Sequence, residues 1–184
     1  QGFAANMGKF YGLPSRGGGA QSDAPVMNQQ AGYESMMTFY SAYSHGVNIV
    51  MEAGGIVDSV NATSIEKMIA DFEVIRLVKA ALTPFEVNEE TLCLDDIKEQ
   101  AHTGSCDYTL DYFMDLYMPH IGGRGAKTKS PTYYEDSIQE EIERLMDEFE
   151  DNRPELDADT KARVRTVLLK SGLSADILDR IEAM

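Results

Sequence analysis

An alternation of extended and helical patterns over residues 11–82 constrains the fold of this chain more than any other feature of its sequence. The pattern consists of an extended segment, a glycine-rich loop, an amphipathic helix, a buried strand and a second helix, at residues 11–14, 15–19, 25–45, 47–51 and 64–82. This order is typical of two consecutive units of a parallel β/α protein. A closed eight-stranded barrel needs about 250 residues, so a chain of 184 residues cannot form a whole one. The sequence therefore predicts a mostly helical α/β fold, which is either a small domain with a minimal sheet or part of something larger.

The predicted strand and the two helices beside it have the clearest local signals. Residues 47–51 are rich in β-branched side chains and are followed by two glycines, which is typical of a buried strand. In the helix that follows, apolar residues recur every three or four positions, and Thr63 and Glu66 have the spacing of a capping box. In the helix before it, we expect Asp23 to cap a first turn near Pro25.

Further helices are expected on both sides of this region. Asn88 is followed by two glutamates and suits the start of a helix that runs to about His102. Gly172 is suited to end a helix in the left-handed conformation. The other predicted helices cover residues 3–10, 135–151, 160–171 and 175–184.

Acidic residues are densest in one segment of the chain. Between residues 135 and 159 there are twelve acidic residues and two arginines, and the flexible composition of residues 122–131 is typical of a linker. We therefore expect a segment over residues 1–121, a linker over 122–131 and an acidic helical carboxyl-terminal region over 132–184. The formal net charge of −15 argues against binding to nucleic acid or to anionic membranes.

Other sequence features exclude several classes of protein. No apolar run approaches the roughly 18 residues needed to cross a bilayer, and the first residues lack the pattern of a secretory signal, so we expect a cytoplasmic location. The two cysteines, Cys93 and Cys106, are too few for a disulfide scaffold and are interpreted as reduced thiols. His102 and Cys106 have the spacing of two zinc ligands, but no second pair accompanies them, and we expect no metal site.

The first 121 residues contain several distinctive stretches, namely residues 12–24, Gln-Ala-Gly-Tyr-Glu at 30–34, and residues 46–50, 53–56, 64–67 and 71–73. Together these stretches resemble the carboxyl-terminal part of the trimethylamine:corrinoid methyltransferase family. The sequence departs from the family pattern at Asn28, where members have an acid, and at residues 101–109, where members have a histidine-rich stretch. The resemblance implies that the chain is the carboxyl-terminal portion of a β/α (TIM-type) barrel with a helical tail.

The resemblance also implies a function. Family members pass a methyl group from a tertiary or quaternary methylamine to the cobalt of a separate corrinoid protein. This chain would then bind no cofactor directly, would have a corrinoid protein and a methylated amine as partners, and would be inactive as an isolated fragment. Some members carry pyrrolysine encoded by an in-frame amber codon, and a reading frame that begins after such a codon would resemble this chain. The alternative hypothesis is a non-catalytic helical module that binds another protein through its acidic helices.

Ligand-binding groups of β/α barrels lie on the loops that follow the strands. The candidate substrate-binding residues are Arg16, Gly18, Asp23, Gln30, Glu34, Glu52, Gly54 and Gly55. The free edges of a partial sheet need covering, so we also expect a homo-oligomer.

Each candidate has an alternative structural interpretation. Glu52 can attract a cationic amine or pair with a neighbouring base such as Arg16. Gln30 and Glu34 share a helix face, so they can point together into a site or bond each other. The glycines of both loops can admit a ligand, form turns or allow close packing of a strand against a helix. The catalytic residues stay unknown at this level.

Overall fold

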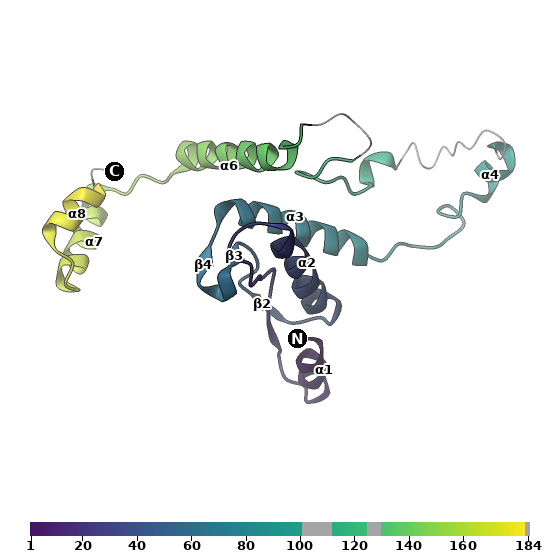
Figure 1. Ribbon diagram of the computed structural model, residues 1–184, viewed down its shortest axis with the longest axis horizontal. Coiled ribbons are helices and arrows are strands. Elements are labelled where there is room, and N and C mark those ends of the chain that lie inside the picture. Colours follow the sequence, from purple (N-terminus) through teal and green to yellow (C-terminus); the bar gives the residue numbers. More distant parts are fainter. Residues whose placement is uncertain (101–111, 125–129, 183–184) are drawn as a thin grey trace. The chain divides into compact units, whose positions relative to one another are not determined.

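The computed structural model describes residues 1–100, 112–124 and 130–182 (Figure 1). The chain forms two compact units, Gln1–Arg144 and Leu145–Met184, whose boundary falls inside one long acidic helix. The predicted linker at residues 122–131 lies partly outside the described residues and stays a prediction. His102 and Cys106 also lie outside them.

The first unit is mostly helical with a few short strands, as predicted. In chain order its elements are α1 (Gly2–Phe10), β1 (Arg16–Gly18), α2 (Gln29–Ser44), β2 (Ile49–Met51), β3 (Ile56–Val57), η1 (Asp58–Val60), β4 (Ala62–Thr63), α3 (Ile65–Leu82), α4 (Leu94–Gln100), η2 (Phe113–Asp115) and α6 (Tyr133–Asn152). The last two turns of α6 belong to the second unit. Strands β1 and β2 pair in parallel, whereas β3 and β4 form a separate antiparallel pair.

The first strand is not where the sequence predicts it. Strand β1 occupies Arg16–Gly18, inside the predicted glycine-rich loop, and the predicted extended segment at 11–14 forms no strand. The glycines serve close packing here rather than a turn. A Cβ atom on Gly19 would lie only 2.5 Å from the Cα atom of Ala53, so the two chains approach each other more closely than side chains permit.

A strand forms within residues 47–51 as predicted, but the prediction that it is buried is wrong. Strand β2 covers Ile49–Met51, and Ile49 and Met51 are 55 % and 39 % exposed. Alternate side chains of a strand point to opposite faces of the sheet. Val50 therefore packs against the helices, next to Phe39 and Val78, while the opposite face of the two-stranded sheet is exposed.

The helices lie close to their predicted positions, but their first turns differ from the prediction. Asn28, not Asp23, caps α2, because its side chain accepts a hydrogen bond from the Ala31 N–H at 3.0 Å. Asp23 instead accepts a hydrogen bond from the Ser59 hydroxyl at 2.9 Å. An Asn side chain satisfies the free N–H groups of a first turn as well as Asp does.

Two further helix starts also differ from the prediction. In one, a neighbouring polar residue takes the cap; in the other, the predicted cap residue closes a turn instead. The cap of α3 is Ser64 rather than Thr63: its hydroxyl accepts from the Lys67 N–H at 3.1 Å and donates to Glu66. Helix α4 begins at Leu94, because Asn88 closes a turn by accepting from the Thr91 N–H at 2.9 Å.

Two apolar clusters hold the first unit together. One joins the segment just after β1 to α2 and α3 through Ala20, Phe39 and Val78. The other joins α3 to α6 through Ile69, Ile121 and Ile138. Helix α3 therefore takes part in both clusters and connects the sheet and α2 with the start of the acidic helix α6.

The second unit holds the end of α6, α7 (Ala158–Lys170) and α8 (Ala175–Glu182), and the last two helices lie close to their predicted positions. Gly172 ends α7 with a φ of +99°, the left-handed conformation expected for it. Leu178 is buried, and Arg165 pairs with Asp179 at 2.6 Å. None of the helices within the described residues combines the length and the apolar composition needed to cross a bilayer.

Candidate functional site

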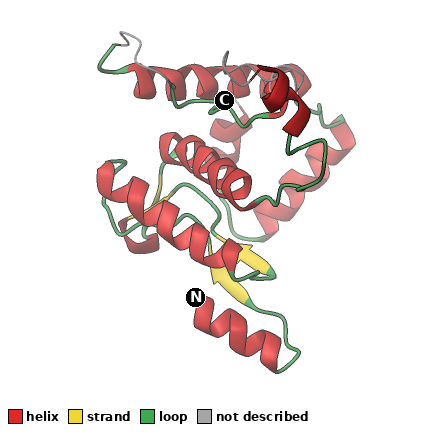
Figure 2. Ribbon diagram, turned by 90° about the vertical axis from the view of Figure 1, so that its right-hand side faces the viewer, coloured by secondary structure: helices red, strands yellow, loops and turns green. Residues whose placement is uncertain are grey.

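The loops that follow β1 and β2 lie together at the carboxyl ends of these strands (Figure 2). The backbone contact continues past the strands: the Gly19 N–H donates to the Met51 carbonyl at 2.8 Å, and the Ala20 N–H donates to the Ala53 carbonyl at 3.1 Å. Carboxyl ends of neighbouring parallel strands are where β/α proteins place their ligands. The candidate site is therefore built at this end of the sheet.

A depression of about 290 Å³ lies at these strand ends and is lined by Arg16, Gly17, Gly18, Gln21, Met51 and Glu52. Three of the predicted binding residues, namely Arg16, Gly18 and Glu52, thus meet in one place. Gln21 was not predicted, although its position just after the glycines of β1 places it in the loop where ligand groups are expected.

Glu52 is held at the rim of this depression by its backbone and by one hydrogen bond. Its φ of +50° is the left-handed conformation, which is unfavourable for a residue with a side chain and is found mainly where the surroundings enforce it. The Gln21 side-chain amide donates a hydrogen bond to the Glu52 carboxylate. The expected alternative, an ion pair between Glu52 and Arg16, is not formed within the described residues.

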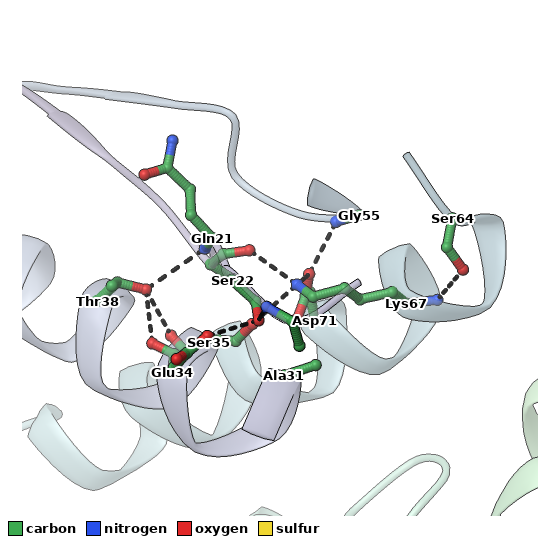
Figure 3. Close-up of polar contacts among 12 residues, drawn as sticks. Gln21, Ser22, Ala31, Glu34, Ser35, Thr38, Gly55, Ser64, Lys67 and Asp71 are labelled. Carbon is green, nitrogen blue, oxygen red and sulfur yellow. Dashed lines mark hydrogen bonds and ion pairs between the residues drawn. The ribbon is translucent and has the colours of Figure 1, made fainter. Parts of the chain in front are cut away.

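A buried ion pair on α3 fixes both loops from behind (Figure 3). The Lys67 ammonium, only 1 % exposed, lies 2.5 Å from the Asp71 carboxylate and donates to the Ser35 hydroxyl at 2.8 Å and the Ala20 carbonyl at 3.0 Å. Asp71 in turn accepts the Gly55 N–H at 2.7 Å. One pair of charges thus holds the loop after β1 and the loop after β2.

Burial raises the pKa of the Asp71 carboxyl above its ordinary value, even though the hydrogen bonds from Lys67 and Gly55 act in the opposite direction. The sequence analysis missed both charged residues, although a signal was present. Lys67 and Asp71 share one face of α3 with Val74 and Val78, so two opposite charges four residues apart lie on an otherwise apolar face.

The two glycines after β2 serve packing and a tight turn. A Cβ atom on Gly54 would lie 3.1 Å from the Asp71 Cβ atom, and one on Gly55, whose φ is +82°, would lie 3.2 Å from the Met68 Cβ atom. This agrees with the structural interpretation of both residues. Their predicted part in substrate binding is untested.

The Glu34 carboxylate accepts hydrogen bonds from the loop after β1. Its carboxylate accepts from the Ser22 hydroxyl at 2.7 Å, the Asp23 N–H at 2.9 Å and the Gln30 side-chain amide at 2.9 Å. These bonds, the one from Ser22 most of all, lower the pKa of Glu34. Gln30 and Glu34 are therefore hydrogen-bonded to each other. Glu34 and Thr38 also line a second depression, of about 220 Å³.

A second buried carboxylate lies outside this site. Glu73 accepts hydrogen bonds from the Tyr117 hydroxyl and from the N–H groups of His120 at 2.9 Å and Ile121 at 3.1 Å. Burial, together with the bond to Glu73, raises the pKa of Tyr117 to about 12. This carboxylate fastens the segment before α6 onto α3 and has a structural role.

Metal-ligating groups and aromatic side chains are two further kinds of ligand-binding group. The described parts of the chain contain no group of three or more His, Cys, Asp or Glu side chains suited to hold a metal ion. On α2, Phe39 is in the core, whereas Tyr33, Tyr40 and Tyr43 are exposed. Tyr43 stacks on Phe39, with their ring centroids 5.9 Å apart, and none of the three tyrosines lines the depression at the strand ends.

Comparison with known proteins adds to this geometry. The model of the family described as trimethylamine methyltransferase (MTTB) matches residues 1–170. A glycine betaine methyltransferase of Desulfitobacterium hafniense is 33% identical over 132 residues, which are 67% of this chain and 26% of that protein. A trimethylamine methyltransferase of Methanosarcina barkeri is 36% identical over 95 residues, which are 52% of this chain and 19% of that protein. The chain thus spans about a fifth to a quarter of the length of the relatives that it matches.

Proposed function

This chain belongs to the trimethylamine methyltransferase family, and we propose that it supplies part of the active site of an enzyme that removes a methyl group from a methylated amine. The observation that carries the proposal is the Gln21–Glu52 pair, which lies in a depression at the carboxyl ends of two parallel strands. A carboxylate there attracts a substituted ammonium group, because its negative charge stabilises the positive charge of that group.

The methyl transfer requires the protein mainly to position the reacting groups. In the transfer, the bond between the methyl carbon and the amine nitrogen breaks, its electron pair stays on nitrogen, and the methyl group moves to an acceptor that attacks from the opposite side. We propose as acceptor a corrinoid carried by a partner protein, which is here a second substrate. The contribution of this chain is to hold the ammonium group in line with the attack, which lowers the barrier through orientation and electrostatic attraction.

The architecture that we propose for the whole enzyme is a β/α barrel to which this chain contributes two strands and their outer helices. The parallel pairing of β1 and β2, with α2 between them in the chain, supports this proposal. The exposed apolar residues Ile49 and Met51 support it as well, because the corresponding face of a complete barrel is its interior. A site of this kind draws residues from several strand ends, so the 184 residues alone are proposed to be inactive.

The proposal can be tested by ligand binding and by turnover. In 15N-labelled protein, tetramethylammonium is expected to shift the amide signals of Gln21 and Glu52, and Glu52→Gln is expected to abolish this response. Glu89→Gln is the matched control, because Glu89 is an exposed loop carboxylate outside the depression. In the complete reading frame with a reduced corrinoid protein, Glu52→Gln is expected to slow demethylation and Glu89→Gln to leave it unchanged. Equal rates for all three proteins would contradict the proposal.

A second candidate function is that of a protein-interaction module, and the surface of the second unit favours it. On α6, Met146 and Phe149 are each 54 % exposed and are surrounded by acidic side chains, of which Glu148 and Glu150 are examples. An apolar stripe with an acidic rim suits a basic amphipathic partner. Under this hypothesis Phe149→Ser abolishes complex formation, while Glu52→Gln has no effect on it.

A further inference from the structure

We propose that Gln21 is a positioning residue, which keeps the Glu52 carboxylate away from the Arg16 guanidinium and so keeps the depression at the strand ends open for a cation. This inference rests on the proposed function, because it assigns the cation to Glu52. It adds a reason why two opposite charges that line one depression do not pair with each other.

Arg16 is the nearest candidate for an ion pair with Glu52. Arg16 pairs with Ile49 in the sheet, and neighbouring residues along a strand point to opposite faces, so both lie on the exposed face, opposite the core residue Val50. The Arg16 side chain lines the same depression as Glu52. Among the residues that the structure describes, none forms a hydrogen bond or an ion pair with the Arg16 guanidinium. Since opposite charges attract, another contact has to keep the two apart.

The backbone of Glu52 and the Gln21 amide together supply that contact. In a regular strand, Glu52 would follow Met51 on the face that packs against the helices. Its φ of +50° interrupts this alternation, and its carboxylate lines the depression, where the Gln21 side-chain amide donates a hydrogen bond to it. An uncharged donor satisfies a carboxylate oxygen without cancelling its charge, whereas a guanidinium would neutralise it. Glu52 therefore stays available to a cationic ligand.

Gln21 is itself held in place. Its backbone N–H donates to the Gly19 carbonyl at 3.0 Å and to the Thr38 hydroxyl at 3.4 Å. Its side chain points away from the buried ion pair of α3 (Figure 3) and lines the depression. A Cβ atom on Gly18 would lie 2.7 Å from the Gln21 Cδ atom, so the glycine leaves the space that the Gln21 amide occupies.

The first test compares the binding of tetramethylammonium to the 184-residue chain and to its variants by NMR titration. Gln21→Met removes the amide and keeps an unbranched side chain of similar length. Glu52 then pairs with Arg16, and an exposed ion pair of ordinary strength is expected to weaken tetramethylammonium binding about two- to fivefold. Gln139→Met is the matched control and is expected to change nothing, because exposed Gln139 donates to Glu143 at 3.2 Å, outside the depression.

A double variant distinguishes positioning from a merely structural role. Arg16→Gln removes the competing cation, so adding Gln21→Met to Arg16→Gln is expected to cause no further loss of tetramethylammonium binding. Gly18→Ala displaces the Gln21 amide without removing it and is expected to reproduce the loss, again only while Arg16 is present. The same loss with and without Arg16 would overturn the inference.

A second measurement needs no ligand and separates this inference from the proposed function. In 15N-labelled protein, Gln21→Met is expected to slow the exchange of the Arg16 side-chain N–H with water, and adding Glu52→Gln is expected to restore it. If tetramethylammonium does not bind, slower exchange still supports positioning by Gln21, while the proposed ammonium site fails. If tetramethylammonium binds at Glu52 but neither its affinity nor the exchange responds to Gln21→Met, the inference is wrong and the proposed function stands. Unchanged amide signals elsewhere in Gln21→Met show that the variant is folded.

Discussion

Replacing Lys67 by Met tests whether the buried ion pair holds the two loops of the site. Methionine keeps an unbranched side chain of similar length, so the packing is largely retained and the ammonium group alone is removed. The Asp71 carboxylate then stays buried without its cation, and the Ala20 carbonyl and the Ser35 hydroxyl each lose a hydrogen-bond donor. Removing one partner of a buried pair costs about 3–5 kcal/mol.

An independent estimate gives the same magnitude. The unpaired Asp71 avoids carrying a buried charge by taking up a proton. Its ordinary pKa is 3.8, so protonation at pH 7 costs about 1.4 kcal/mol for each of roughly three pH units, or about 4 kcal/mol. This value is an upper limit for the charge penalty at pH 7. Since the carboxyl pKa is higher in the folded than in the unfolded state, stability is lost as the pH rises and regained as it falls toward 3.8.

The assay is urea unfolding followed by circular dichroism at pH 5 and pH 7, since the chain has no tryptophan. Lys67→Met is expected to lower the unfolding free energy by about 4 kcal/mol at pH 7. At pH 5 this loss is expected to be smaller by about 3 kcal/mol. Lys79→Met, an exposed lysine on the same helix, is the control and is expected to change stability by less than about 0.5 kcal/mol. A loss below about 1 kcal/mol at pH 7, or a loss that does not depend on pH, would refute the reasoning.

Two further predictions concern stability. Gly19→Ala is expected to lower the free energy of unfolding by about 1–3 kcal/mol, because the new Cβ atom would overlap the Ala53 backbone. Gly32→Ala, on an open helix face, is expected to raise it by about 0.5–1 kcal/mol. Urea midpoints check both variants, and a change of the same sign in both would contradict the close approach. Hydrogen bonds from Arg144 lower the pKa of Glu141 to about 2. The ionised Glu141 carboxylate therefore stabilises the folded state above about pH 4.5, and this stabilisation is lost as the pH falls toward 2. Glu141→Gln is expected to flatten acid unfolding in that window, and an unchanged pH profile would count against the pairing.

The helices could be predicted because their signals are local. The apolar repeat of α3 and the breaking proline after it are properties of consecutive residues, and they locate Ile65–Leu82 to within two residues. The caps were harder, since Thr63 and Ser64 are both good capping residues and only the local geometry decides between them.

The strands could not be located in the same way, because their positions depend on contacts far apart in the sequence. Three glycines in a row indicate a loop, yet Gly17 and Gly18 lie in β1, where they pair with Val50 and Met51 of β2. The exposure of Ile49 has a similar origin: an apolar strand shows that something can cover it, not that these 184 residues do so. Likewise, Glu52 was found from its place after a strand, whereas its partner Gln21 follows from the fold.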